Sequence, residues 1–212
     1  LVSRKIPSTN AAAPGLRADW NVLKSTWSIL ADLYRDRRLF RVALMSSWFW
    51  LVGAIVLSVL PVIVKDTLGG GETMVTFFLA VFAVSIGIGS AIAAWFCAGR
   101  VVLLPAVLGT ALLAVFCFDA HLALEGFTAS KASVTLIDFM AQPGVRRIAI
   151  DMAGLAISGA MLAVPTFTAL QAWAAPEHRA RTIAGANALG AAVMAASGVA
   201  LAFAQNLGLG TS

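Results

Sequence analysis

The amino-acid sequence predicts an all-α membrane protein with five transmembrane helices, preceded by an amphipathic helix on the cytoplasmic side. First, 60% of the 212 residues are hydrophobic and only 12% are charged, whereas soluble domains carry about 25% charged residues. Second, five apolar runs are long enough to cross a bilayer of about 30 Å as helices. Third, these runs lack the alternating pattern of strands and are too long for the strands of a membrane barrel.

Residues 1–41 are predicted to form a basic cytoplasmic segment. They hold eight Lys and Arg residues against three acidic residues, and so they carry the whole net charge of +5. The basic residues adjoin a hydrophobic run, as in juxtamembrane segments, whereas a nucleic-acid binder carries them on a folded polar surface. We therefore expect no nucleic-acid partner.

An amphipathic helix is expected within this segment, at about residues 19–36, with Asp19 as its N-cap. Its apolar residues recur at spacings of three and four, which places them on one helical face: Trp20, Leu23, Trp27, Leu30 and Tyr34. This face is expected either to lie among lipid headgroups or to pack on the cytoplasmic surface of the protein itself. The preceding residues, 7–15, are expected to be a flexible linker.

The helix bundle is predicted to occupy residues 42–204. Its five spans are expected at about residues 42–64, 74–98, 101–118, 148–174 and 182–204. Only Gly99 and Arg100 separate the second span from the third, which predicts a tight hairpin, whereas a polar loop, 119–147, precedes the fourth. Residues 205–212 form a short tail. Three spans are expected to kink at a proline: Pro61, Pro105 and Pro165.

The distribution of basic residues predicts the orientation of the spans. Eleven Lys and Arg residues fall on the side of the N-terminal segment, and four fall on the opposite side. Because basic residues accumulate in cytoplasmic loops, the N-terminal segment is expected in the cytoplasm. The loop 119–147 is then external.

Polar side chains inside the spans are the first candidate functional residues. Asp151 is the only acidic residue within a predicted span. Arg147 lies four positions earlier on the same helical face, so we expect an Arg147–Asp151 ion pair at the outer interface. The alternative is that Asp151 forms a gate or contacts a substrate headgroup. Gln171 and Asn187 lie toward the inner ends of the last two spans, where they either hydrogen bond between helices or face a polar cavity.

Two tryptophans in the first span, Trp48 and Trp50, are further candidates. They lie seven to nine residues beyond Arg41, or roughly 10–14 Å along a helix, which is deep for an interfacial anchor. Phe49 lies between them, and three consecutive aromatic residues cover more than half of the helix circumference. At least one is therefore expected to face the bundle interior, either packed against neighbouring helices or in contact with substrate on the cytoplasmic side.

Signals of catalysis are lacking in the sequence. His121 and His178 have no Asp five positions later, so the His-x4-Asp pattern of glycerolipid acyltransferases is missing. Serine-hydrolase, phosphate-loop and zinc-protease motifs are also missing. We therefore expect no catalytic residue, no metal site and no cofactor.

Four stretches carry a resemblance to a known family: SWFWLVGAIVLSVLPVIVKDTLGG (47–70), VTFFLAVFAVSIGIGSAIAAWFCAGR (75–100), and residues 139–171 and 176–198. They resemble helices seven, eight, ten and eleven of the lysophospholipid transporter branch of the major facilitator superfamily. The similarity is greatest to forms fused to an acyltransferase and an acyl-carrier-protein synthetase. It covers about residues 40–204 in collinear order.

The resemblance implies a C-terminal-half fragment of a secondary transporter. Residues 1–41 would link two six-helix halves, and residues 42–204 would supply five helices of the second half. The N-terminal six-helix half, the twelfth helix and any fused acyltransferase would lie outside this sequence. The whole protein would move lysophospholipid, in particular lysophosphatidylethanolamine, across the bacterial inner membrane by alternating access. Membrane lipids would be further partners.

The resemblance also implies gating turns on the cytoplasmic side. One would contain Gly99 and Arg100, and the other would contain Arg179 and Arg181. The acidic residue usual three positions before the glycine is replaced by Phe96, which argues against the usual charge network there.

Two other functions remain open from the sequence. One is an exporter of drugs or small metabolites in the same superfamily. The other is a non-transporting membrane scaffold, in which Asp151, Gln171 and Asn187 would be fully paired, with no cavity beside them.

Overall fold

The computed structural model describes residues 20–127 and 135–206, and this part of the chain contains seven α-helices. They are α1 Val22–Arg35, α2 Arg37–Val62, α3 Glu72–Cys97, α4 Leu104–Glu125, α5 Leu136–Ala141, α6 Pro143–Trp173 and α7 Arg179–Asn206. A π-helical turn, η2 Ile63–Thr67, continues α2. Five of the described helices are long and apolar enough to cross a membrane: α2 with η2, α3, α4, α6 and α7. The all-α class is thus confirmed, and the five candidate transmembrane helices suggest a multi-pass membrane protein.

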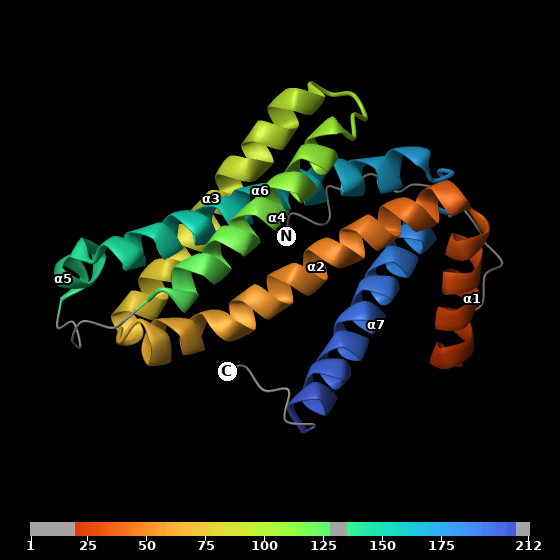
Figure 1. Cartoon of the computed structure of the whole chain (residues 1–212). Helices are drawn as coiled ribbons and strands as arrows, with labels where there is room; N and C mark the ends of the chain where they lie inside the picture. The colour runs from red at the N-terminus through yellow and green to blue at the C-terminus, as the bar shows by residue number, and fades with distance from the viewer. Residues whose placement is uncertain (1–19, 128–134, 207–212) are drawn as a thin grey trace, which may run out of the picture.

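Helix α6 lies at the centre of the bundle, with α3 and α4 packed along it (Figure 1). In its apolar stretch 78% of the residues are buried, against 17–28% in the other four spans. Small residues allow this close packing. Gly89 of α3 lies against the backbone of Ile157, and Gly109 of α4 lies against the backbone of Ser158. Much of the apolar surface of α2, α3, α4 and α7 is therefore not covered by other described residues.

The connection between α3 and α4 differs from the predicted tight hairpin. Ala98 and Gly99 turn the chain in left-handed conformations, with φ of 43° and 77°, but α3 and α4 barely touch each other. Each packs on α6 instead, because Gly89 of α3 and Gly109 of α4 let these helices approach the α6 backbone closely. Pro105 does not kink a span, since it lies in the first turn of α4, where proline fits without loss of a hydrogen bond.

The predicted external loop, 119–147, contains helical segments in its described part, so the helices on either side extend further than the predicted spans. Helix α4 continues to Glu125, α5 spans Leu136–Ala141, and α6 already begins at Pro143. The polar residues of this region pair between and along helices, so they extend the helices instead of interrupting them. Arg147 pairs with Asp119, and His121 lies 3.4 Å from Glu125.

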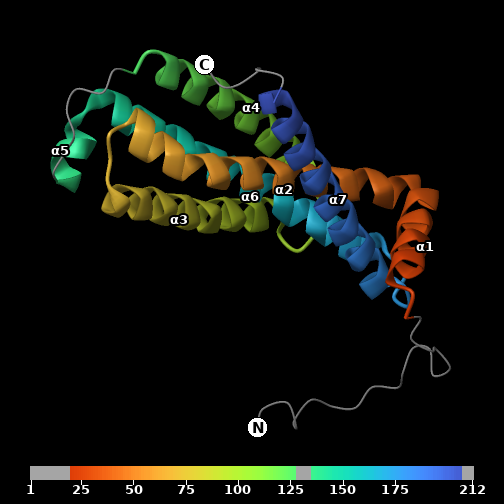
Figure 2. The same cartoon turned by 90° about the horizontal axis from the view of Figure 1, so that it is seen from below.

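Helices α1, α2 and α7 meet at the other end of the bundle, where α1 runs beside the start of α7 (Figures 1 and 2). The N-cap of α1 is Asn21, whose side chain accepts from the backbone N–H of Lys24 at 3.0 Å; the predicted cap, Asp19, and the segments 1–18 and 207–212 lie outside the described residues. Asp36 ends α1 and caps α2 by accepting from the backbone N–H groups of Arg38 and Leu39.

Helix α1 both docks on the protein and keeps an exposed apolar stripe. Leu33 is buried, and Ile29 lies against Gly185 of α7. Most of the predicted apolar face nevertheless remains exposed: Trp20, Leu23, Trp27 and Tyr34. Docking on the protein and contact with lipid headgroups are therefore compatible, because the face of α1 that docks is different from the face that carries the tryptophans.

Candidate functional site

An apolar cavity of about 400 Å³ lies within the bundle, among α2, α3, α4, α6 and α7. Its wall is formed by aliphatic and aromatic side chains, with Phe49 and Trp50 on one side and Phe82 and Leu113 on another. Gly53 of α2 also lines it, and no atom lies within 4 Å of the position where a Cβ would be added. The absence of a side chain at this position therefore contributes to the open space.

Trp50 is the candidate tryptophan that lines this cavity. Its ring meets Phe49 edge to face at 5.3 Å between centroids, and the Phe49 ring in turn contacts the position of Gly159 on α6. Trp48 lines a separate hollow, which it shares with Arg41 and with Thr110 of α4. Trp50 is 46% exposed and Trp48 is 51% exposed, so each residue lies at the boundary of the described fold.

Asp151 is buried in α6 near the opposite end of the bundle from α1, with 2% of its surface exposed. The predicted Arg147–Asp151 pair is wrong, because Arg147 binds Asp119 of α4 instead. Its Nη2 donates to Oδ1 of Asp119 at 2.5 Å, and its Nε donates to Oδ2 at 3.2 Å. A facing helix can offer both carboxylate oxygens to one guanidinium, which favours this two-bond arrangement.

The side chains of Asp119 and Asp151 are also near enough to interact with each other. Oδ2 of Asp151 has no hydrogen-bond partner among the described residues. Asp119 is not among the residues predicted from the sequence, because it lies at the start of the predicted external loop. Its position immediately after the apolar run of the third span was the available signal.

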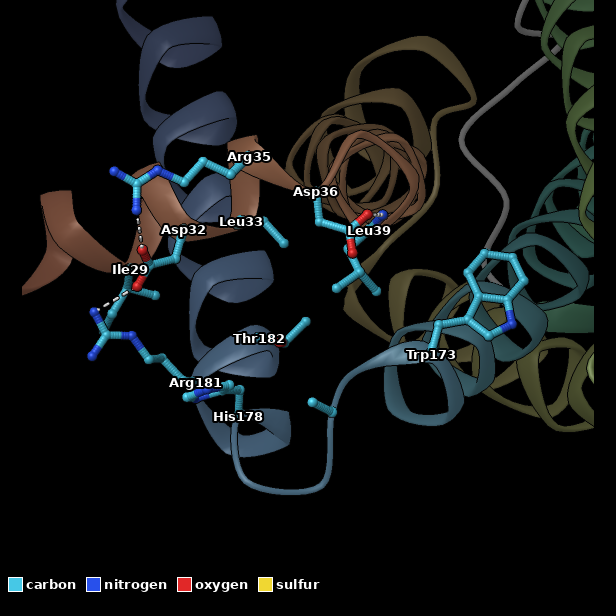
Figure 3. A pocket seen from close by; sticks show the side chains of 11 residues that line it. Ile29, Asp32, Leu33, Arg35, Asp36, Leu39, Trp173, His178, Arg181 and Thr182 are labelled. Carbon is cyan, nitrogen blue, oxygen red and sulfur yellow. Dashed lines mark hydrogen bonds and ion pairs between the residues drawn. The ribbon is translucent and has the colours of Figure 1, made fainter. Parts of the chain in front are cut away.

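A pocket of about 540 Å³ lies at the cytoplasmic end predicted from the charge distribution, between α1, the start of α2 and the connection from α6 to α7. Arg35 and Arg181 reach Asp32 from two sides (Figure 3). The Nη2 of Arg181 lies 2.8 Å from Oδ2 of Asp32 and donates to Oγ of Ser28 at 2.6 Å. Arg181, predicted as a gating residue, therefore fastens α7 to α1.

Trp173 lines the same pocket, at the end of α6. The guanidinium carbon of Arg38 lies 3.6 Å from the centroid of its ring. This cation–π contact joins the start of α2 to the end of α6. Neither Trp173 nor Asp32 was among the residues selected from the sequence, since a stacked or paired partner is visible only after the helices are placed.

The remaining candidates are dispersed over the surface. The side chains of Gln171 on α6 and Asn187 on α7 are exposed, and neither lines the apolar cavity. Gly99 and Arg100 form the exposed turn after α3, and Arg179 is exposed at the start of α7. Of the candidates, only Trp50 belongs to the cavity.

In residues 20–127 and 135–206, no three His, Cys, Asp or Glu side chains come together as possible metal ligands.

Comparison of the chain with protein-family models, with curated proteins and with solved structures found no match.

Proposed function

We propose that this chain is the membrane-embedded part of a secondary transporter that moves lysophospholipid, in particular lysophosphatidylethanolamine, across a bacterial inner membrane. The observation that carries the proposal is the apolar cavity beside Trp50. Its volume lies in the range typical of small-molecule sites. An acyl chain gains about 0.8 kcal/mol for each CH₂ group that it buries, so an apolar wall would hold such a chain.

The scarcity of buried charge supports an amphiphilic cargo over a sugar or an ion. Asp151 is the only buried charged side chain among the described residues. Paths for ions and polar solutes are lined with charged groups, amides or backbone carbonyls. The wall of the apolar cavity has none of these side chains.

The cytoplasmic pocket offers groups for a zwitterionic headgroup. It brings the cationic side chains of Arg35 and Arg181 together with the carboxylates of Asp32 and Asp36. A headgroup with one phosphate and one ammonium needs both signs of charge close together. This arrangement supports a lipid with a polar head on the cytoplasmic side.

The unburied faces of the helices support a missing partner within the same protein. Only 17% of the apolar stretch of α7, and the same share of that of α2, is buried. Asn187 and Gln171 lie on the exposed surface, where lipid would not satisfy their amides. An N-terminal six-helix half that covers this surface would supply partners and would complete the transport path between two bundles.

The scaffold alternative is disfavoured by the same features. It requires fully paired polar residues and no cavity, whereas Oδ2 of Asp151 lacks a partner among the described residues and Trp50 borders a cavity. An exporter of apolar drugs would share the cavity, so transport must separate these two functions.

The test is uptake of labelled lysophosphatidylethanolamine by spheroplasts that carry the full-length protein. The wild type is expected to exceed empty-vector cells. Gly53→Leu should fall to the empty-vector level, because Gly53 lines the cavity, an added Cβ has open space around it, and the longer side chain would occupy cavity volume. Gly87→Leu is the matched control: Gly87 is exposed on α3, also has no atom within 4 Å of an added Cβ, and does not line the cavity. Equal uptake by wild-type and empty-vector cells would sink the proposal, and efflux of an apolar dye without lipid uptake would favour the exporter.

A further inference from the structure

Asp151 makes no ion pair with another described residue, although Arg147 is near enough to interact with it electrostatically. The guanidinium of Arg147 makes both of its hydrogen bonds to Asp119, so that pair is electrically neutral. Asp151 is 2% exposed, and its Oδ2 lacks a donor among the described residues. An ionised carboxylate in this position would be a buried, unpaired charge, which costs several kcal/mol.

The neighbouring carboxyl group makes ionisation of Asp151 still less favourable. The side chain of Asp119 is near enough to interact with that of Asp151, and two neighbouring carboxyl groups do not both ionise readily. Because the guanidinium of Arg147 stabilises a negative charge on Asp119, a proton held by the two carboxyl groups is expected on Asp151. As a carboxylic acid, Asp151 can donate its proton in a hydrogen bond to Asp119.

We propose that Asp151 binds a proton in this arrangement, and that the proton and the guanidinium of Arg147 are alternative partners of its carboxyl group. Arg147 lies one helical turn before Asp151 on α6, the spacing at which side chains on a helix meet. When Asp151 releases its proton to water, by way of the partly exposed Asp119, Arg147 moves from Asp119 to Asp151. Proton release thereby opens the only ion pair between α4 and α6 in the described part of the chain.

Among the described residues, the other charged groups at this end of the bundle do not provide Asp151 with a partner. Lys65 of η2 pairs with Glu72 of α3 at 2.5 Å, and His121 lies beside Glu125 on α4. Asp138 of α5 accepts from the hydroxyl of Thr135 at 2.6 Å. Two further charged side chains are exposed: Asp66 and Arg146. Within the described part of the chain, the exchange therefore involves Asp119, Arg147 and Asp151, and it does not rest on the identity of the cargo.

The test is infrared spectroscopy of the purified full-length protein in nanodiscs, with the aspartate carboxyl carbons labelled with ¹³C. At neutral pH the wild type should show the C=O stretching band of a protonated aspartic acid, and Asp151→Asn should lose it. Asp119→Asn should lose the same band, because Arg147 is then free to pair with Asp151. Glu125→Gln is the matched control, since this exposed acid of α4 is expected to leave the band unchanged.

A band that persists in Asp151→Asn overturns proton binding, and one that persists in Asp119→Asn overturns the exchange. If either variant fails to fold, the wild type is titrated with spin labels at two exposed positions, Leu122 of α4 and Ile150 of α6. Cys97 and Cys117 are first replaced by Ser. The distance between the labels should change in the same pH interval in which the band disappears. An unchanged distance, or a wild type with no band, refutes the proposal.

Discussion

The close contact between α3 and α6 makes Gly89 the most informative position for a stability test. A Cβ at Gly89 would overlap the backbone oxygen of Ile157 and would lie 2.7 Å from its Cα. Both atoms belong to the backbone of the central helix, so no side-chain rotation can relieve the overlap. Gly87, two residues earlier on α3, has no atom within 4 Å of an added Cβ. The two glycines therefore lie in the same helix, and they differ in how closely α6 packs against them.

Gly89→Ala and Gly87→Ala should differ by about 1–3 kcal/mol in the free energy of unfolding. Alanine is favoured over glycine in a helix by about 1 kcal/mol, and this gain is common to both variants. Overpacking against a rigid neighbour costs about 1–3 kcal/mol, and this cost applies only to Gly89→Ala. Gly87→Ala should thus be slightly stabilised, whereas Gly89→Ala should be neutral or destabilised by up to about 2 kcal/mol.

The assay is thermal unfolding of the purified full-length protein in detergent, followed by circular dichroism. About 1 kcal/mol shifts the midpoint by roughly 2–4 °C in a domain of this size. Gly89→Ala should therefore unfold roughly 2–12 °C below Gly87→Ala. Gly109→Ala, whose Cβ would lie 2.6 Å from the backbone oxygen of Ser158, should behave like Gly89→Ala. Equal midpoints for Gly87→Ala and Gly89→Ala would refute the close approach of α3 to α6.

Two further predictions concern α1. A double-mutant cycle of Arg181→Ala and Asp32→Ala should give a coupling energy of about 0.2–1 kcal/mol, because both side chains are partly exposed, at 43% and 46%; zero coupling would mean that the pair does not fasten α1 to α7. Replacement of Trp20 and Trp27 by Phe should remove tryptophan fluorescence that lipids brominated near the headgroup quench, because both indoles are exposed on α1. Unchanged quenching in that variant would show that the stripe does not contact lipid.

The spans were predictable because membrane crossing depends on the length and apolarity of a continuous run. Such a run is read directly from the order of residues, and all five predicted spans coincide with helices. Their ends were less predictable. Asp119 and Arg147 were polar enough to indicate a loop, yet they extend α4 and α6 because they pair with each other across the two helices.

The sequence allowed some residues of the candidate site to be predicted, but it did not reveal which residues they pair with. Asp151 was selected as the one acidic residue of the spans, and it proved to be buried. Its expected partner, Arg147, was wrong because spacing within one helix cannot reveal what a neighbouring helix presents. Similarly, Arg181 was selected from the sequence, whereas its partner Asp32 lies almost 150 positions earlier and meets it only when α1 docks on α7.

By itself, the sequence determined the all-α class, the number of apolar helices and the amphipathic character of α1, because each depends on residues that are neighbours along one helix. The tertiary structure decided that α6 is the central helix, that Trp50 and not Trp48 borders the apolar cavity, and that Asp119 takes Arg147 away from Asp151. These outcomes depend on how close two helices approach and on which faces they turn to each other. Small residues such as Gly89 permit that approach, but only the packed bundle defines which surface they meet.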